Sequence, residues 1–386
     1  MASNKVCIVG YARTAMGGLS GSLASQTAPE LGAVAIKGAL ERAGVAAEAV
    51  QEVYMGHVLS AGVGQAPAKQ AALKAGILPS VPCTSVNKVC SSGMKAIHVA
   101  AASILIGQSD LVVAGGMESM TGAPFLLPAA TRGGLRYGNS ELRDSCASDG
   151  LTDPYGDQAM GCLAEECAEE HGISLVRACP RGCRRGVFAD EIVPVVIKSR
   201  KGETVVDADD EPARFNPAKF PSLRTVFKRD GTVTAGNAST ISDGAAAVIL
   251  ASEAKAAELG LTVYATIEGM GDASQDPAKF TTSPAHAIPV ACKRAGIELA
   301  DADLVEINEA FAVVALANMA LLGLDDAKVN IYGGAVSIGH PLGCSGARIV
   351  VTLLNALIRE GKSVGIAGIC NGGGGASALV IKRPAA

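Results

Sequence analysis

The chain has 386 residues and a mass of 38.8 kDa, with 49% hydrophobic and 18% charged residues, 46 glycines and no tryptophan. At about 150 residues per domain, this length predicts roughly two to three domains with a large buried core, and it excludes a small disulfide-stapled scaffold. The net charge is −4 and basic residues form no long runs, so the composition disfavours nucleic acid or an anionic membrane as the main partner.

The 11 cysteines are odd in number, and no secretory signal precedes the first predicted strand. Both features favour a reducing compartment over a disulfide framework, so we expect a cytoplasmic protein. Cys179 and Cys183 are spaced C-x3-C without a nearby histidine pair, so no zinc site is expected. No apolar run reaches the length of about 18 uncharged residues that a membrane span requires.

Apolar β-rich runs alternate with alanine-rich helical stretches along the chain. This pattern is typical of α/β layers around a mostly parallel, buried sheet. In the first part, strands are predicted over 6–12, 50–58, 83–89 and 111–115, and helices over 30–43, 66–75 and 91–107. In the last part, strands are predicted over 263–269, 304–307, 329–332 and 364–369, and helices over 284–295, 310–322 and 343–359.

The two parts resemble each other, which predicts an internal duplication. Gly93 and Gly115 correspond to Gly346 and Gly368 at one constant spacing. The runs 246–250 and 376–380 are equivalent closing strands, so the first copy is interrupted by an insertion. The predicted units are an N-terminal half (1–120 plus 242–262), an inserted loop domain (121–241) and a C-terminal half (263–386).

Cys90 lies between a predicted strand and a predicted helix. A thiol at a helix N-terminus meets the positive end of the helix dipole, which lowers its pKa and favours the thiolate. A buried, inert cysteine is the commoner fate of a free thiol. Position alone therefore leaves both a nucleophile and a structural cysteine open.

His340 lies in the corresponding turn of the second copy. At the same spacing it matches Asn87, three residues before Cys90. Equivalent loops of two similar lobes can face each other, so His340 is a candidate to approach Cys90; a structural histidine is the alternative. Cys344 is a weaker candidate, because it falls inside the predicted helix start.

Cys370 is followed by Asn371 and four glycines. Backbone amides in such a loop can approach a ligand closely and form an oxyanion hole; a merely flexible turn is the alternative. Asn308 ends a predicted strand, where its amide can cap the next helix or hold a catalytic water. Thiols, an imidazole, an amide and glycine-rich turns together indicate acyl transfer through a thioester, with a second thiol free to move an α-proton.

Four blocks of the sequence resemble the signature motifs of the thiolases, in the order that this family has them. These blocks are Val89-Cys90-Ser91-Ser92-Gly93-Met94-Lys95-Ala96, Asn308-Glu309-Ala310-Phe311-Ala312, Gly339-His340-Pro341-Leu342-Gly343 followed by Ser345-Gly346-Ala347-Arg348, and Cys370-x-Gly372-Gly373-Gly374. The resemblance runs from about residue 6 to residue 382 and is greatest to the thiolases that form acetoacetyl-CoA, with 279–284 similar to cytosolic eukaryotic members.

The resemblance implies an α/β fold with a five-layered α-β-α-β-α core, built from two duplicated βαβαβαββ halves with an inserted loop domain, and a homotetramer arranged as a dimer of dimers. It also implies roles for site residues. Cys90 would be acylated, His340 would deprotonate it, and Cys370 would exchange the α-proton. Asn308 would hold a water in one oxyanion hole, and the amides of Cys90 and Gly372 would form the other.

The resemblance further implies how substrate is bound. Residues 234–239 resemble the family's pantetheine-binding loop, with Ala235 and Ser239 as contacts. The positions expected to line the acyl pocket or coenzyme A tunnel are Leu151, Met160, Phe227, Ala310 and Phe311. The expected ligands are acetyl-CoA, acetoacetyl-CoA and CoA as substrates and products, with no separate cofactor and no metal.

Two departures from the family pattern stand out. Residues 175–185 replace a longer amphipathic helix and contain Pro180 and Gly182, which break helical periodicity. Ala159 stands where many acetoacetyl-type members have a histidine, so the acyl chain length stays open. The alternatives are a thiolase for longer 3-ketoacyl-CoAs, a decarboxylating ketoacyl synthase, which would be expected to carry a second histidine, and a non-catalytic lipid-binding or scaffold protein, which would be expected to lack a catalytic position.

Overall fold

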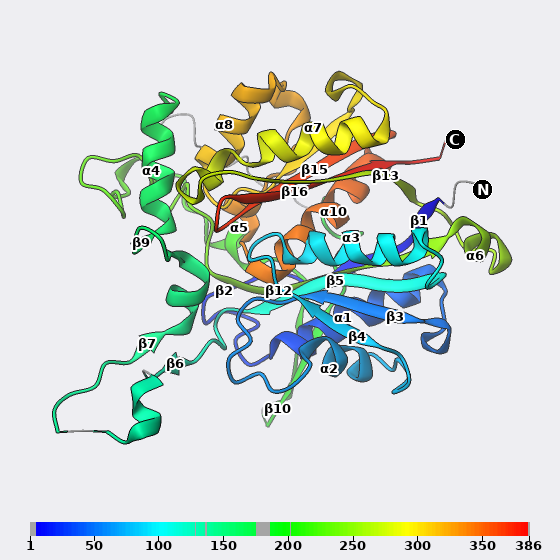
Figure 1. Ribbon diagram of the computed structural model, residues 1–386, viewed down its shortest axis with the longest axis horizontal. Coiled ribbons are helices and arrows are strands. Elements are labelled where there is room, and N and C mark those ends of the chain that lie inside the picture. Colours follow the sequence, from blue (N-terminus) through cyan, green and yellow to red (C-terminus); the bar gives the residue numbers. More distant parts are fainter. Residues whose placement is uncertain (1–4, 128, 136, 175–185, 201, 385–386) are drawn as a thin grey trace.

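The structure is a computed structural model that describes residues 5–384 except 128, 136, 175–185 and 201. The predictions for 175–185, including those for Cys179 and Cys183, lie outside the described residues. Within the described part, the elements stack as alternating layers of helices and sheet (Figure 1).

The N-terminal half forms one side of the sheet, in the order β4-β3-β5-β12-β1. Strand β3 is parallel to β4 and β5, whereas β12 is antiparallel to β5 and β1. Helix α1 begins at a capping box between Thr27 and Glu30 and ends at Gly44, whose φ of 66° favours glycine. The elements are β1 (Val6–Arg13), α1 (Ala28–Ala43), β3 (Glu52–Gly56), α2 (Pro67–Lys74), β4 (Cys83–Val86), α3 (Ser92–Leu105), β5 (Leu111–Ser119) and β12 (Ser242–Ser252).

The C-terminal half repeats this arrangement in the order β14-β15-β16-β13. Three residue pairs between β1 and β13 join the two halves into one ten-stranded sheet. The order on each side of this junction is equivalent, which supports the predicted duplication. The elements are β13 (Ala265–Ser274), α7 (Pro284–Ala295), β14 (Leu304–Ile307), α8 (Ala312–Leu322), α9 (Ala335–Ile338), α10 (Leu342–Arg359), β15 (Val364–Asn371) and β16 (Gly375–Lys382).

Two expectations for the sheet were wrong. The sheet is mixed rather than mostly parallel, because the closing strand β16 returns from β15 through a tight hairpin, which can only give antiparallel neighbours. The strand expected over 329–332 is reduced to a single bridge between Val305 and Val329. The side chain of Asn330 exchanges hydrogen bonds with the backbone of Ile307 at 2.8 and 2.9 Å, so it satisfies the backbone groups that a further strand would have paired.

Helices α3 and α10 form the middle layer between the two parts of the sheet, with α1 and α2 outside one part and α7 and α8 outside the other (Figure 1). This is the predicted five-layered core. Helix α10 has the length and mean hydropathy of a membrane span although Arg348 and Arg359 interrupt its apolar run, but 89% of it is buried inside the molecule, as is typical of a core helix. The two middle helices cross near their N-termini, where a Cβ added to Gly93 would lie 2.8 Å from the Ala347 nitrogen. Glycine at this crossing lets the helix starts that follow Cys90 and His340 approach each other.

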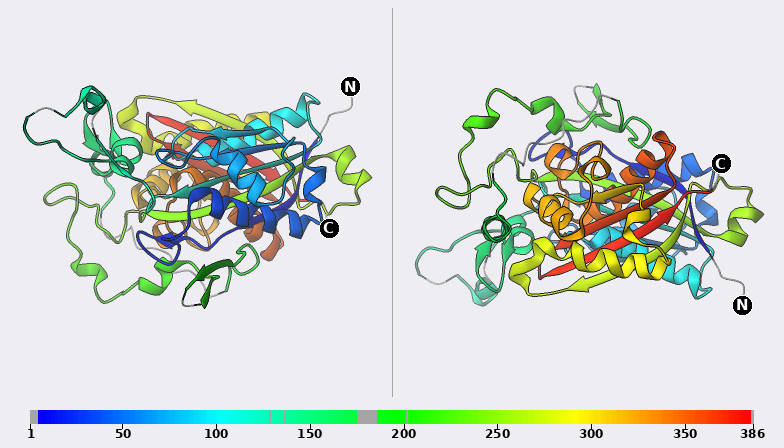
Figure 2. Two further views of the ribbon diagram at one scale, coloured as in Figure 1. Left: turned by 90° about the horizontal axis from the view of Figure 1, so that it is seen from below. Right: turned by 90° about the horizontal axis from the view of Figure 1, so that it is seen from above.

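Residues between β5 and β12 leave the core and form an irregular region at one end of it and, with the β10–β11 hairpin, along one side (Figure 2). It is fastened to the core by Arg13 of β1, which forms buried ion pairs with Glu191 at 2.5 Å and with Asp209 at 2.6 Å. The elements of this region are β6 (Phe125–Leu126), η2 (Ala129–Gly133), β7 (Arg143–Asp144), η3 (Ala147–Leu151), β8 (Thr152–Asp153), β9 (Gln158–Ala159), α4 (Met160–Glu170), β10 (Val195–Ser199), β11 (Gly202–Val206), α5 (Asp210–Arg214) and η5 (Phe220–Ser222). The remaining elements are β2 (Gly17–Gly18), η1 (Ala47–Ala49), α6 (Glu253–Glu258), η6 (Pro277–Thr282), η7 (Leu299–Asp301) and η8 (Asp326–Lys328).

Candidate active site

Cys90 lies in the short turn between β4 and α3 and is 7% exposed. Burial raises the pKa of its thiol to about 11, and the hydrogen bond that the Gly372 amide donates to it lowers the pKa only in part. The expectation of a lowered pKa at the helix start was therefore wrong, because desolvation outweighs the helix terminus. Cys90 is a protonated thiol at neutral pH and needs a base before it can act as a nucleophile.

The backbone just before Cys90 is strained. Val89 has a φ of 49°, a left-handed conformation that a β-branched residue rarely adopts. Hydrogen bonds clamp this turn, since the Val89 amide donates to Asn87 Oδ1 at 2.9 Å and its carbonyl accepts from Ser92 Oγ at 2.6 Å. Strain of about 1–3 kcal/mol that is held by its surroundings is typical of functional sites.

Cys370 is beside Cys90, near the end of β15. It is completely buried, and its pKa is raised well above the ordinary value by burial and then by the neighbouring Cys90. The hairpin that follows pairs Asn371 with Gly375, and Gly373 and Gly374 turn it with φ values of 81° and 78°. The glycine run is thus a tight, defined hairpin rather than a flexible turn, and it aims the Gly372 amide at the first thiol.

His340 lies in the turn between α9 and α10 and is 4% exposed. Its backbone amide donates to the Thr240 carbonyl at 3.2 Å, and its ring Nδ1 is 2.6 Å from Ser345 Oγ. Burial, followed by the positive charge of Arg348, lowers the pKa of the ring to about 3. The ring is therefore neutral at physiological pH, the form that can accept a proton.

Asn308 follows β14 and faces His340. Its Nδ2 is 3.5 Å from each ring nitrogen of His340, and its Oδ1 accepts a hydrogen bond from Arg348 Nη2 at 3.3 Å. The N-cap of α8 is Phe311. Of the two roles left open for Asn308, the structure excludes the helix cap and puts the amide beside the imidazole.

The predicted substrate-binding side chains fall around this centre. Met160 and Phe311 pack on the apolar cluster that contains Cys370 and Ala310, and Leu151 packs on the cluster that contains Cys90. Phe227 meets Phe311 edge to face, with ring centroids 6.1 Å apart. Ser239 belongs to the same region, because its amide and hydroxyl both donate to the Ala310 carbonyl, at 3.1 and 2.7 Å.

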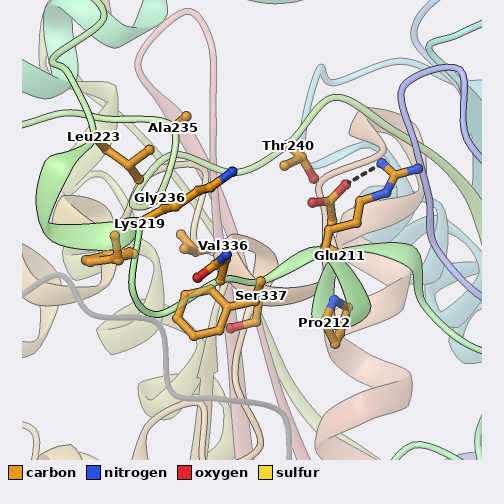
Figure 3. A pocket seen from close by; sticks show the side chains of 13 residues that line it. Glu211, Pro212, Lys219, Leu223, Ala235, Gly236, Thr240, Val336 and Ser337 are labelled. Carbon is orange, nitrogen blue, oxygen red and sulfur yellow. Dashed lines mark hydrogen bonds and ion pairs between the residues drawn. The ribbon is translucent and has the colours of Figure 1, made fainter.

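A cavity of about 390 Å³ has Thr240 in its wall (Figure 3), and the Thr240 carbonyl accepts the hydrogen bond from the His340 amide. Ala235, the other predicted binding residue, lines it together with Gly236, whereas Thr240 and Ser337 connect it to the His340 turn. Further lining residues had not been predicted, namely Glu211, Pro212, Arg214, Phe215, Asn216, Lys219, Phe220, Leu223 and Val336. Most of them come from the irregular region, where no periodicity or motif marks a binding residue. Ser345 and Arg348 stand in a quoted motif, but the motif alone assigned them no role.

These features define a class of protein: a two-lobed α/β acyl-transfer enzyme, with two adjacent thiols at a glycine hairpin and a neutral imidazole facing an amide. Comparison with known proteins agrees. Residues 6–254 match the family model "Thiolase, N-terminal domain" and residues 261–383 match "Thiolase, C-terminal domain". The chain belongs to the thiolase family, so the resemblance predicted from the four motifs is confirmed.

The chain is similar to curated proteins and to solved structures over nearly its whole length. An acetyl-CoA acetyltransferase of Arabidopsis thaliana is 56% identical over 98% of this chain and 96% of its own length. An acetyl-CoA acetyltransferase of Saccharomyces cerevisiae is 51% identical over 99% of this chain and 100% of its own length. A solved acetyl-CoA acetyltransferase from Syntrophomonas wolfei superposes with a TM-score of 0.94 at 36% identity, covering 99% and 100% of the two chains. A thiolase from Ascaris suum in complex with coenzyme A gives a TM-score of 0.91 at 41% identity, covering 98% and 100%.

Proposed function

We propose that this chain is an acetyl-CoA C-acetyltransferase, which converts two acetyl-CoA to acetoacetyl-CoA and CoA, and the reverse, through an acyl-cysteine intermediate. The observation that carries the proposal is the pair of neighbouring buried thiols Cys90 and Cys370, the first of which accepts a hydrogen bond from the Gly372 amide, together with the neutral ring of His340. The similarity to acetyl-CoA acetyltransferases over nearly the whole chain supports the substrate class.

In the first step, the neutral ring of His340 takes the thiol proton of Cys90. The thiolate attacks the acetyl-CoA carbonyl, the new carbon–sulfur bond forms, and the bond to the CoA sulfur breaks. The CoA thiolate leaves with the proton that His340 held. A thiol with a pKa of about 11 makes this base necessary, because the thiolate is scarce at neutral pH without it.

In the second step, His340, neutral again once CoA has left, takes the thiol proton of Cys370, and the Cys370 thiolate removes an α-proton from a second acetyl-CoA. The carbanion attacks the acetyl group on Cys90, a carbon–carbon bond forms, and the Cys90 thiolate leaves and takes back the proton that His340 held. The burial that raises the pKa of Cys370 makes its thiolate a strong base. Donors stabilise the negative oxygens: a water held by Asn308 on one side, and the amides of Cys90 and Gly372 on the other.

Coenzyme A would be bound by the insertion, 121–241, against the two core halves (1–120 plus 242–262, and 263–386). The cavity beside the His340 turn suits its pantetheine and nucleotide end, because Ala235 and the basic side chain of Lys219 both line it (Figure 3). Ser239 and the apolar group of Leu151, Met160, Phe227, Ala310 and Phe311 would hold the acyl end. CoA is substrate and product, and these steps use only groups of the chain and of the substrates.

We further propose a homotetramer in the cytoplasm. The described residues between 121 and 146 form an arm that projects from the molecule (Figures 1 and 2), and Phe125, Leu135 and Leu142 in it are 61–66% exposed. An apolar projection of this kind suits contact with another copy. A similar acetyl-CoA acetyltransferase of Gibberella zeae, 52% identical, is described as cytosolic. The proposal includes neither nucleic acid nor a membrane as partner.

The decisive experiment is a thiolysis assay of purified protein with acetoacetyl-CoA and CoA. Longer 3-ketoacyl-CoAs are tested in parallel, because Ala159 pairs with Thr152 between Leu151 and Met160 and leaves a small side chain there. Preference for acetoacetyl-CoA supports the proposal. Faster thiolysis of the longer substrates would make the chain a broader 3-ketoacyl-CoA thiolase, and acetyl-CoA binding without turnover would favour a non-catalytic protein.

A further inference from the structure

The hydroxyl of Ser345, in the first turn of α10, touches His340. Its Oγ lies 2.6 Å from His340 Nδ1 and 2.8 Å from the Pro341 carbonyl oxygen, and the residue is completely buried. A serine hydroxyl has one proton to donate and lone pairs to accept with. The two contacts therefore decide where the protons lie.

The Pro341 carbonyl can only accept, so the Ser345 proton must point to it. If the hydroxyl donated to His340 instead, two oxygens carrying lone pairs would face each other at 2.8 Å. With its proton used, the hydroxyl accepts, and Nδ1 must carry the hydrogen. We infer that Ser345 holds His340 in the Nδ1–H tautomer and leaves Nε2 unprotonated, so that Nε2 is the atom that takes the Cys90 proton.

Among the described residues, no other contact of the ring makes this choice. Asn308 Nδ2 is 3.5 Å from both ring nitrogens and does not distinguish them. The ring is neutral, because burial and Arg348 lower its pKa to about 3, so it carries a single proton whose position matters. Ser345 thus acts as a positioning residue through His340.

The hydroxyl of the equivalent serine in the first half donates and accepts hydrogen bonds in the same directions. At the spacing of the duplication, Ser345 corresponds to Ser92, whose Oγ donates to the Val89 carbonyl at 2.6 Å and accepts from the Lys88 amide at 2.8 Å. An amide N–H is an obligatory donor, so the direction of that pair of bonds is certain. In each half the serine donates to a turn carbonyl and accepts from an N–H, and in the second half the imidazole supplies the N–H.

The direct test is the tautomer in the intact protein. Two-bond ¹H–¹⁵N correlation spectra of ¹⁵N-histidine-labelled protein distinguish Nδ1–H from Nε2–H, and the loss of one signal in His340→Asn assigns the ring among the 5 histidines. We expect Nδ1–H in the wild type and a mixture in Ser345→Ala. A wild-type spectrum with Nε2–H would overturn the inference, whether or not Ser345→Ala folds.

The catalytic consequence rests on the proposed function. Ser345→Ala should lower the acylation rate by about 10-fold to 100-fold, a part of what a positioned base contributes. Thr352→Val is the matched control: it removes a buried hydroxyl from the same helix, one that donates to Glu191 at 3.0 Å and leaves His340 untouched. It should keep the wild-type tautomer and rate per folded molecule. An equal loss of acylation rate in both variants would mean that Ser345 has only a structural role. A wild-type protein that has the Nδ1–H tautomer but no activity would contradict the proposed function and leave the tautomer inference intact.

Discussion

Arg348 and Asn308 are joined in the interior of the protein by a hydrogen bond from Nη2 to Oδ1 of 3.3 Å. Because Arg348 can only donate, the bond fixes which end of the Asn308 amide is oxygen and turns Nδ2 toward His340. The same guanidinium helps to keep His340 neutral through its charge. One buried cation therefore orients Asn308 and keeps His340 in its neutral form.

Removing this cation should impair catalysis more than binding. We expect Arg348→Met to lower kcat by about 10-fold to 100-fold, corresponding to roughly 1.5–3 kcal/mol for a hydrogen bond to a charged group, with KM little changed. Burial raises the pKa of nearby Glu306 to about 8, so the variant leaves a mostly neutral acid there. Steady-state kinetics per folded molecule measure the effect.

The control for this variant is Arg42→Met. Arg42 is half-buried and donates to the backbone carbonyls of Tyr11, Glu191 and Ile192, away from the site. The Arg42→Met variant should be less stable than the wild type but should keep the wild-type kcat. A fall in kcat of the same size in both variants would mean that Arg348 supports the fold only.

Acylation experiments should distinguish the roles of the two thiols, Cys90 and Cys370. Cys90→Ala should take up no acetyl group from acetyl-CoA, because the covalent bond has no acceptor, whereas Cys370→Ala should still be acylated but should not exchange α-protons. Intact-protein mass spectrometry detects the adduct, and deuterium exchange into acetyl-CoA detects the second function. An adduct retained on Cys90→Ala would reverse the assignment.

Much of the fold could be predicted because periodicity and glycine spacing reflect backbone requirements. Gly93 and Gly346 mark the crossing of α3 and α10, where no side chain fits. The strand expected over 329–332 failed for a reason that periodicity does not contain, since the Asn330 side chain pairs with Ile307 in its place. The direction of β16 likewise depends on the hairpin after Asn371 rather than on its apolar pattern.

The candidate site, like the fold, could be predicted only in part. Cys90, His340, Cys370 and Asn308 stand in compact motifs and could be named from the sequence. The pKa of Cys90 could not, because it depends on burial by distant parts of the chain. Lys219 and most of the other cavity residues belong to the region between β5 and β12, whose position on the core is set by tertiary contacts.

The low pKa of His340 has consequences for activity and stability. His340→Asn should slow acylation by about 10² to 10⁴-fold, the usual contribution of a general base.

The stability of the protein should also depend on the protonation of this histidine. Below pH about 6.5 the imidazole is protonated in the unfolded chain, whereas in the folded protein the ring stays neutral down to a pH of about 3. The unfolded state then binds more protons, so the free energy of unfolding decreases as the pH falls from 6.5 toward 4.

Denaturant unfolding at several pH values compares the wild type with His340→Asn. The variant lacks the titrating group, so its free energy of unfolding should fall less steeply, by about 1 kcal/mol per pH unit in this window. His57, whose pKa is lowered to about 4 by burial, is present in both proteins and cancels in the comparison. Parallel curves would show that His340 titrates normally in the folded protein.

The cavity predicts a binding residue outside every motif. The neighbouring Arg214 is paired with Glu211 and Asp210, whereas no ion pair holds the Lys219 side chain among the described residues. An unpaired cation in a cavity wall suits the phosphates of coenzyme A, so Lys219→Met should raise KM for CoA substrates by about 3-fold to 10-fold, the scale of an exposed charge contact, and leave kcat unchanged. Lys198→Met, at an exposed ion pair of the β10–β11 hairpin, removes the same charge elsewhere. If both variants change KM equally, the general charge of the protein attracts the substrate and the cavity is not where the phosphates bind.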